Sequence, residues 1–386
     1  MADVTAQAQP VPVAPELVSA PVRARLSWLW ATLAHGALVA VAVLVVVRLG
    51  YAGNLAQAVS QWDTLWYIKI AIHGYPAAVA PSWAYFPLYP FTITALDLIR
   101  LSPLISGLAV SLVGTMAFAY CLQRLSSLEF GPEGASWAPW LVLMSPFGAF
   151  FAFAYTEGLF FALAAGSLLC ARRGRFGWAA VLAALATATR PTGIALAPAL
   201  AVEALRQSGR RWDVLIPRLA WLGTVVVVAD LMILWASFRT QHPLVMLTAE
   251  TRYFGVHLAW PWTGLVTTVR AAFSAPFGPS TSPVGAIAWD FQQELIAAAV
   301  GLVLVGWACW KLRPAYSVFM TASFLLAISL NDWRSTGRYE LALFPAAFLI
   351  VAVTRRAPWL RWILVVLGSA SMAYGASMFA RGMWLG

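Results

Sequence analysis

A succession of long apolar runs limits this chain to very few kinds of fold. The run 26–47 contains no Asp, Glu, Lys or Arg, and about 20 apolar residues suffice to cross a bilayer. Only 10% of the residues are charged, against roughly 25% in soluble domains, and the mean hydropathy is +0.76. We therefore expect an all-α polytopic membrane protein. Its expected spans are 26–47, 103–123, 137–153, 156–171, 215–237, 294–312, 315–330, 340–354 and 359–380.

Clusters of arginine predict the side of the membrane that each loop occupies. Cytoplasmic loops carry an excess of Arg and Lys, so Arg172–Arg175 and Arg210-Arg211 should both be cytoplasmic. The segment 176–205 must then cross an even number of times, which predicts a helical hairpin with Arg190-Pro191 at its outer tip. Because the first helix already brings the chain outside, 86–100 is expected to be a juxtamembrane helix and not a span.

This threading predicts about eleven spanning helices, within a range of nine to twelve, with the N-terminus cytoplasmic and the C-terminus outside. Residues 1–25 are expected to form a disordered cytoplasmic tail, and 26–386 a single transmembrane domain. The large loops 48–102 and 238–293 then lie on the extracytoplasmic side. The net charge of +10 reflects topology-setting arginines, so the bilayer and not nucleic acid is the expected partner.

The extracytoplasmic stretch QWDTLWYIKIAIHGYP, residues 61–76, places one carboxylate, Asp63, between Trp62 and Trp66. Aromatic neighbours partly desolvate a carboxylate and make it a stronger base, which suits removal of a proton from an acceptor hydroxyl. The same pattern is also typical of an interfacial helix cap with an aromatic membrane belt. His73 and Tyr75 follow in the same stretch and would line a site around Asp63.

Three further charged residues are predicted on the same face. Glu157 stands at the start of a predicted helix, as an N-terminal helix acid or as a second acid of the site. Arg190 and Arg338 would be costly in apolar surroundings without a partner, and a phosphate is a natural one. The alternatives are contact of Arg190 with lipid headgroups, and an ion pair of Arg338 with Asp332 or Glu340.

The loop RYFGVHLAWPW, residues 252–262, is rich in aromatic rings, which suit sugar stacking and interfacial belts equally. Trp260, Trp262 and Tyr339 are candidate substrate contacts, and Arg252 is a further candidate phosphate ligand. The sequence lacks Walker, HExxH, CxxC, GxSxG and Asp-x-Asp motifs, so we expect no metal and no cofactor. Polar motifs on one face favour an active site at the membrane surface over a transporter, whose polar residues gather at the midplane.

Several of these segments resemble the PIG-V mannosyltransferase family, including its bacterial members, and the resemblance runs from about residue 26 to 380. The segments are Trp62-Asp63 to Gly74-Tyr75, Phe86–Pro90, Ser145-Pro146 to Tyr155-Thr156-Glu157, Ala188–Gly193 and Gly337-Arg338-Tyr339. The resemblance implies a GT-C fold, a catalytic Asp in the first extracytoplasmic loop, and a polyprenyl- or dolichyl-phosphate mannose donor. By position Asp63 matches that Asp, whereas the acceptor does not carry over.

The resulting hypothesis is mannosyl transfer from polyprenyl-phosphate mannose to a hydroxyl of an unknown glycan, lipid or protein acceptor at the outer membrane face. Asp63 would act as general base, and Arg190, Arg338 and Arg252 would stabilise the departing phosphate. Two alternatives stay open. One is a GT-C transferase that uses another lipid-linked sugar, and the other is a non-enzymatic lipid-binding protein or flippase.

Overall fold

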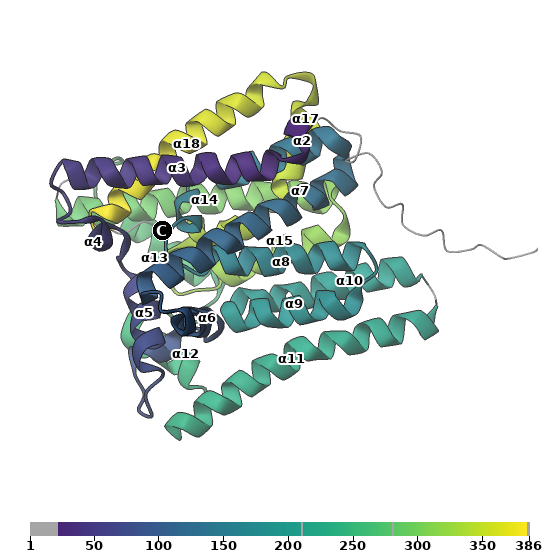
Figure 1. The fold of residues 1–386 in the computed structure, drawn as a ribbon, viewed down its shortest axis with the longest axis horizontal. Helices are drawn as coiled ribbons and strands as arrows, with labels where there is room; N and C mark the ends of the chain where they lie inside the picture. Colours follow the sequence, from purple (N-terminus) through teal and green to yellow (C-terminus); the bar gives the residue numbers. More distant parts are fainter. Residues whose placement is uncertain (1–21, 210, 280–281, 384–386) are drawn as a thin grey trace, which may run out of the picture.

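The computed structural model describes residues 22–209, 211–279 and 282–383. Apart from one isolated bridge between Leu258 and Leu330, the described chain has only helices, turns and loops. Most of the long helices cross Figure 1 in roughly the same direction, and several short helices of the segments 48–102 and 238–293 lie towards its left side. The prediction of an all-helical protein is confirmed.

The predicted N-terminal tail is only partly within the described chain, because residues 1–21 lie outside it. Val22–Arg25 forms a short helix, α2, so this part of the predicted disordered tail is ordered. The side-chain amide of Gln123 donates hydrogen bonds of 3.0 Å to the carbonyls of Ala24 and Arg25. These bonds hold α2 against the following transmembrane bundle.

The described chain is a multi-pass membrane protein by the length and composition of its helices. Five helices are long and apolar enough to cross a bilayer, and a pair bent by 65° makes six if it counts as one span. The five are α3 (Ser27–Arg48), Pro103–Gly131 of α7 (Pro103–Leu143), α11 (Trp212–Thr240), α14 (Pro283–Lys311) and α18 (Trp359–Ala380). The bent pair is Thr336–Leu343, which comprises α16 and η6, followed by Ala346–Arg356, which comprises α17 and η7.

The prediction of about eleven spans is therefore not supported, because several predicted spans are too short. Helix α8 (Glu157–Arg172) has 16 residues and α15 (Pro314–Ile328) has 15. At 1.5 Å per residue these helices reach about 22–24 Å, less than the roughly 30 Å of a hydrocarbon core. The predicted span 137–153 is also wrong, because α7 ends at Leu143 and a turn with the short helix η3 (Gly148–Phe151) follows.

The two predicted extracytoplasmic loops are built from short helices. Loop 48–102 contains α4 (Leu55–Val59), α5 (Asp63–His73), η1 (Pro81–Ala84), α6 (Leu88–Leu96) and η2 (Asp97–Ile99). The predicted juxtamembrane helix 86–100 thus appears as α6 and η2, too short to cross a membrane. Loop 238–293 contains α12 (Val245–Ala249), η5 (Glu250–Phe254) and α13 (Pro261–Ala272).

The second loop ends earlier than predicted, because α14 begins at Pro283. Ser282 caps this helix: its hydroxyl oxygen accepts a hydrogen bond of 3.1 Å from the Gly285 amide. Proline at the first helical position does not cost a hydrogen bond there. The Ser-Pro start lies well before the apolar run that the sequence pattern marks.

The predicted helical hairpin appears as α9 (Phe176–Thr189), η4 (Pro191–Ala195) and α10 (Leu196–Ser208). Its helices have 14 and 13 residues, so the predicted two crossings of the membrane are not supported. Arg190, at the tip, contacts Glu157 at the start of α8, whereas Gln207 donates to the carbonyl of Ala171 at the end of α8. Helix α9 therefore runs antiparallel to α8, and α10 runs back. A Cβ on Gly193 would collide with the backbone of Ala186 and Thr187, so the tight return requires glycine.

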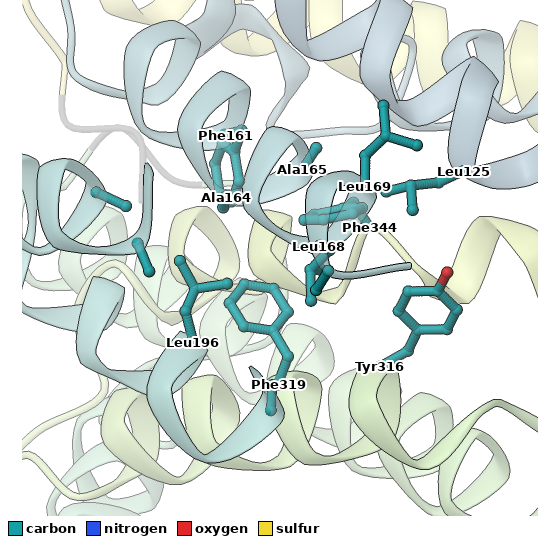
Figure 2. Packing of buried hydrophobic residues seen from close by; sticks show 14 of the residues in the cluster. Leu125, Phe161, Ala164, Ala165, Leu168, Leu169, Leu196, Tyr316, Phe319 and Phe344 are labelled. Atoms are coloured by element: carbon teal, nitrogen blue, oxygen red, sulfur yellow. The ribbon is translucent and has the colours of Figure 1, made fainter. Parts of the chain in front are cut away.

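The largest core cluster surrounds α8 (Figure 2). Phe161 and Leu168 of α8 pack among side chains of α7, α10, α15 and the segment after η6, including Leu125, Leu196, Phe319 and Phe344. Because α8 is enclosed by protein along its length, its shortness exposes little backbone to lipid.

A second group of charges joins the helices at the end opposite the Arg190 turn. We call Glu129, Arg172, Glu203 and Arg313 the distal cluster. Arg313 donates two hydrogen bonds of 2.8 Å to Glu203, and Arg172 donates one of 2.8 Å to Glu129. Tyr316 donates to Glu129 at 2.9 Å. The distal cluster thereby connects α7, α8, α10 and α15.

Candidate active site

Four charged side chains from distant segments meet at the end of the molecule formed by α5 and the Arg190 turn. Arg338 Nη1 lies 2.9 Å from Asp63 Oδ2, and Arg338 Nε lies 3.5 Å from Glu157 Oε1. Arg190 Nη1 lies 2.5 Å from the same Glu157 oxygen. Asp63, Arg338, Glu157 and Arg190 thus form one continuous chain of alternating charge, which we call the site cluster.

Asp63 is the first residue of α5, where a carboxylate is favoured by the helix dipole. The preceding Trp62 has a φ of 52°, a left-handed backbone conformation that is rare for a bulky residue. The Asp63 amide donates to the Tyr155 hydroxyl at 3.2 Å, and Tyr85 donates to Asp63 Oδ1 at 3.1 Å. With 18% of its side chain exposed, Asp63 is held from several sides but stays accessible.

A wall of aromatic rings stands beside Asp63. Trp66 stacks on Tyr85 with ring centroids 5.9 Å apart, and Phe254 meets both rings edge-on. Burial, with the neighbouring charge of Asp63, raises the pKa of Tyr85 far above its usual value. Tyr85 therefore stays protonated and acts as a hydrogen-bond donor to Asp63.

Glu157 fixes both arginines from the buried side of the cluster. Its side chain is fully buried, and its Oε1 atom forms ion pairs with both guanidinium groups. The two guanidinium groups also lie over the ring of Tyr339, at 5.3 Å for Arg190 and 5.6 Å for Arg338. Glu157 thus belongs to the site cluster and is also the first residue of α8, so its position fits both predicted interpretations. The ring of Tyr339 supports both cations.

The structure rejects the alternative placements of the two arginines. Arg190 is only 8% exposed and pairs with Glu157 instead of extending from the protein surface. Arg338 pairs with Asp63 and Glu157 instead of Asp332, which pairs with Arg334 at 2.7 Å, or Glu340.

Close packing explains the glycine that precedes Arg338. A Cβ on Gly337 would collide with the ring of Phe147, which belongs to the Ser145-Pro146-Phe147 turn. Glycine therefore lets the segment that carries Arg338 approach this turn closely.

Several predicted lining residues lie away from the site cluster. His73 is exposed at the far end of α5, and Tyr75 is buried behind Tyr85, donating to its carbonyl at 2.6 Å. Trp260 and Trp262 stack on each other with centroids 4.9 Å apart and are both exposed. Within the described residues no hydrogen bond or ring contact joins these four residues to Asp63, Glu157 or the two arginines.

Two further predicted residues lie at the margin. Trp62 is 39% exposed, and its indole NH donates to the Met383 carbonyl at 3.2 Å. Arg252 is exposed in η5, where its guanidinium lies over Tyr253 instead of joining the cluster.

Sequence reasoning missed Tyr85, Tyr155 and Glu250. Tyr155 lies in one of the segments that carry the family resemblance, and Tyr85 directly precedes another, Phe86–Pro90, but nothing in the sequence marks their hydroxyls as partners of Asp63. Burial, with the charge of Asp63, raises the pKa of Glu250 to about 7, and Arg338 opposes the rise. Glu250 thus places a second titratable carboxyl in the electrostatic field of Asp63.

The described residues contain no group of three or more His, Cys, Asp or Glu side chains arranged to hold a metal ion. The cations of the site cluster are arginines. Metal-independent chemistry remains a prediction.

Comparison with known proteins gives the following similarities. The sequence model of the family described as Mannosyltransferase (PIG-V) matches residues 34–216, which include Asp63, Glu157 and Arg190 but not Arg338. The curated "GPI alpha-1,6-mannosyltransferase 2" of Cricetulus griseus is 32% identical over 152 residues, and that of Homo sapiens is 28% identical over 152 residues. Each match covers 36% of this chain and only 30% of the relative's length.

Two crystal structures of the Archaeoglobus fulgidus oligosaccharyltransferase are also similar in part. The structure tethered with an acceptor peptide containing the NVT sequon has a TM-score of 0.42 at 12% identity and covers 91% of this chain and 56% of that chain. The complex with Zn and sulfate has a TM-score of 0.43 at 14% identity, with coverages of 90% and 53%.

Proposed function

We propose that this chain is a GT-C mannosyltransferase of the PIG-V family that takes mannose from polyprenyl-phosphate mannose. The observation that carries the proposal is the site cluster, in which an accessible carboxylate and two buried arginines adjoin. Transfer from a lipid phosphate to a hydroxyl needs a base for the acceptor and positive charge for the leaving phosphate. The family match over residues 34–216 and the curated relatives support mannose as the sugar.

In the proposed reaction the acceptor oxygen attacks the anomeric carbon, and the bond from that carbon to the phosphate oxygen breaks. The acceptor proton passes to Asp63, and polyprenyl phosphate leaves as an anion. Tyr85 and Arg338 each occupy one oxygen of Asp63, and each oxygen still has a lone pair for the acceptor hydroxyl. The two contacts orient the carboxylate before the acceptor arrives.

Arg190 and Arg338 are the proposed phosphate ligands. Glu157 and the ring of Tyr339 hold both guanidinium groups in place, so little reorganisation is needed when charge develops on the phosphate. Arg338 contacts the base as well, which would place the leaving group next to the acceptor proton. Arg252 remains a secondary candidate because it lies outside the cluster.

The proposed reaction takes place on the extracytoplasmic side of the membrane. The site cluster lies at the opposite end of α8 from the arginine-rich turn 172–175, and Arg355 also lies at that other end, where it donates to the Phe130 carbonyl. Arginine-rich turns favour the cytoplasmic side. The lipid donor would reach the cluster from the bilayer, and the acceptor is a hydroxyl compound at the outer face.

The test uses purified protein in liposomes with radiolabelled polyprenyl-phosphate mannose and a crude membrane extract as acceptor. Release of polyprenyl phosphate is compared between wild type and Asp63→Asn. Release that requires Asp63 supports the proposal. Equal release by both proteins would refute the role of Asp63, and absence of donor binding would favour a lipid-binding protein or another lipid-linked sugar.

A further inference from the structure

A buried carboxylate outside the site cluster holds the segment that carries Arg338. Glu294 lies in α14 and is 4% exposed. A carboxylate inside a membrane-spanning helix is costly unless it has partners. None of the ion pairs within 4 Å in the described chain includes Glu294, so its partners must be of another kind.

Two backbone amides supply these partners. The Ser335 amide donates to Glu294 Oε1 at 2.8 Å, and the Gly337 amide donates to Oε2 at 2.8 Å. Each oxygen thus accepts from a different residue of one tight turn, which fixes both the position and the direction of the turn. Hydrogen bonds to a charged acceptor are about twice as strong as neutral ones.

The turn has an unusual backbone that needs such support. Ser335 has a φ of 66°, in the left-handed region that non-glycine residues seldom adopt. Trp333, just before it, is held by a 3.0 Å hydrogen bond from its amide to the Thr268 hydroxyl of α13. On the other side, Gly337 packs against Phe147. The turn is therefore enclosed between α13, α14 and the Phe147 turn.

Arg338 directly follows the second amide that Glu294 binds. A shift of the Gly337 peptide would move the Arg338 backbone and so the 2.9 Å contact of its guanidinium with Asp63. We propose that Glu294 is a positioning residue, which acts on the reaction only by placing Arg338 between Asp63 and Glu157. This inference rests on the proposed function for its catalytic consequence, but the placement of the turn can be tested separately.

The first test measures amide hydrogen exchange of peptides covering 333–339 in the full-length protein. Glu294→Gln preserves the side-chain volume but replaces one acceptor oxygen with an NH2 group, which cannot accept from an amide. We expect exchange at Ser335 and Gly337 to accelerate at least about tenfold. The matched control is Glu203→Gln, which alters another buried carboxylate, in the distal cluster. At a temperature where both variants are fully folded it should leave these amides unchanged. Unchanged exchange in Glu294→Gln, or equal acceleration in the control, would overturn the proposal.

The second test is a double-mutant cycle on the affinity for polyprenyl phosphate. We expect Glu294→Gln to weaken binding about tenfold in the wild-type background and less than about twofold in Arg338→Ala, because the positioned group is then absent. Equal weakening in both backgrounds would show that Glu294 does not act through Arg338. If wild type does not bind polyprenyl phosphate, the proposed function fails, and the exchange experiment alone decides the role of Glu294.

Discussion

The two ends of the molecule carry charge clusters of the same composition, two carboxylates and two arginines, in different surroundings. In the distal cluster Arg313 forms a two-bond pair with Glu203, which also accepts from Gln207 at 2.6 Å. In the site cluster Arg338 is shared between two acids, and its Nε and Glu157 Oε2 are buried without hydrogen bonds within the described residues. The same set of charged groups thus has most of its hydrogen-bonding capacity used in the distal cluster, whereas the site cluster keeps buried polar atoms without hydrogen bonds.

This difference separates a scaffold from a site. A buried polar atom without a hydrogen bond costs about 1–3 kcal/mol, so the site cluster is held together at the expense of stability. Its cations lie against Tyr339 and other rings, which orient them without neutralising them. Such an arrangement leaves hydrogen-bonding capacity for an incoming ligand, whereas the distal cluster leaves much less.

Asp63→Asn should give the largest effect on turnover and the clearest contrast between the site cluster and the distal cluster. Removing a general base lowers turnover by roughly a hundredfold to ten-thousandfold, and we expect about a thousandfold here. Thermal stability should fall only modestly, because Arg338 keeps Glu157 as a partner and the amide oxygen still accepts from Tyr85. Polyprenyl phosphate release and the melting temperature are measured on the same preparations. A large loss of stability together with activity would mean that Asp63 serves the fold, like the distal acids.

Glu203→Gln should show the reverse pattern. Glu203 is 1% exposed and its partner Arg313 is 23% exposed, so the pair is partly screened and its loss should cost about 2 kcal/mol. We expect a lower melting temperature and unchanged turnover per folded molecule below it. A change in turnover at a temperature where the variant is fully folded would show that the two ends are coupled.

Arg190→Ala sharpens the assignment within the site cluster. Loss of one charge-assisted hydrogen bond to phosphate, worth about 1.5–3 kcal/mol, should weaken polyprenyl phosphate binding at least about tenfold. Equilibrium binding to liposome-embedded protein measures this, with Arg211→Ala as the control because Arg211 is exposed at the other end of the molecule and pairs with Asp213. Unchanged affinity would mean that Arg190 only neutralises Glu157.

The sequence allowed the membership of the site cluster to be predicted, because one rule about arginines and sides of the membrane places Asp63, Glu157, Arg190 and Arg338 on one face. The ion pair between Arg338 and Asp63 could not be predicted from the sequence, because the two residues are 275 positions apart. Proximity in sequence was misleading for His73. Ten residues along α5 separate it from Asp63, about 15 Å, whereas Trp66 shares the face of Asp63 three residues on.

The number of spans was not predictable from apolar runs alone. Helices such as α8 and α15 are as apolar as a span, but they are short and many of their side chains pack against other helices. An apolar run therefore indicates only that its side chains avoid water. The sequence pattern is the same whether they are buried inside the protein or face lipid. The length of the helix in the folded chain distinguishes a buried helix from a span. That length depends on where local turns end the helix, as at Leu143 and Pro283.

The smallest predicted effect concerns Glu250. It tests whether an additional negative charge near the site cluster changes the binding of the lipid phosphate. Its pKa of about 7 lies above the ordinary 4.5, so the folded protein favours the neutral carboxyl, and its contribution to stability is lost as the pH rises towards and through 7. Above pH 7 the ionised group adds negative charge near Asp63 and should weaken binding of an anionic lipid phosphate severalfold between pH 6 and 8. Glu250→Gln should flatten this dependence while matching wild type at pH 6. If the variant keeps the full pH dependence, another group governs it, and the field of the site cluster does not extend to η5.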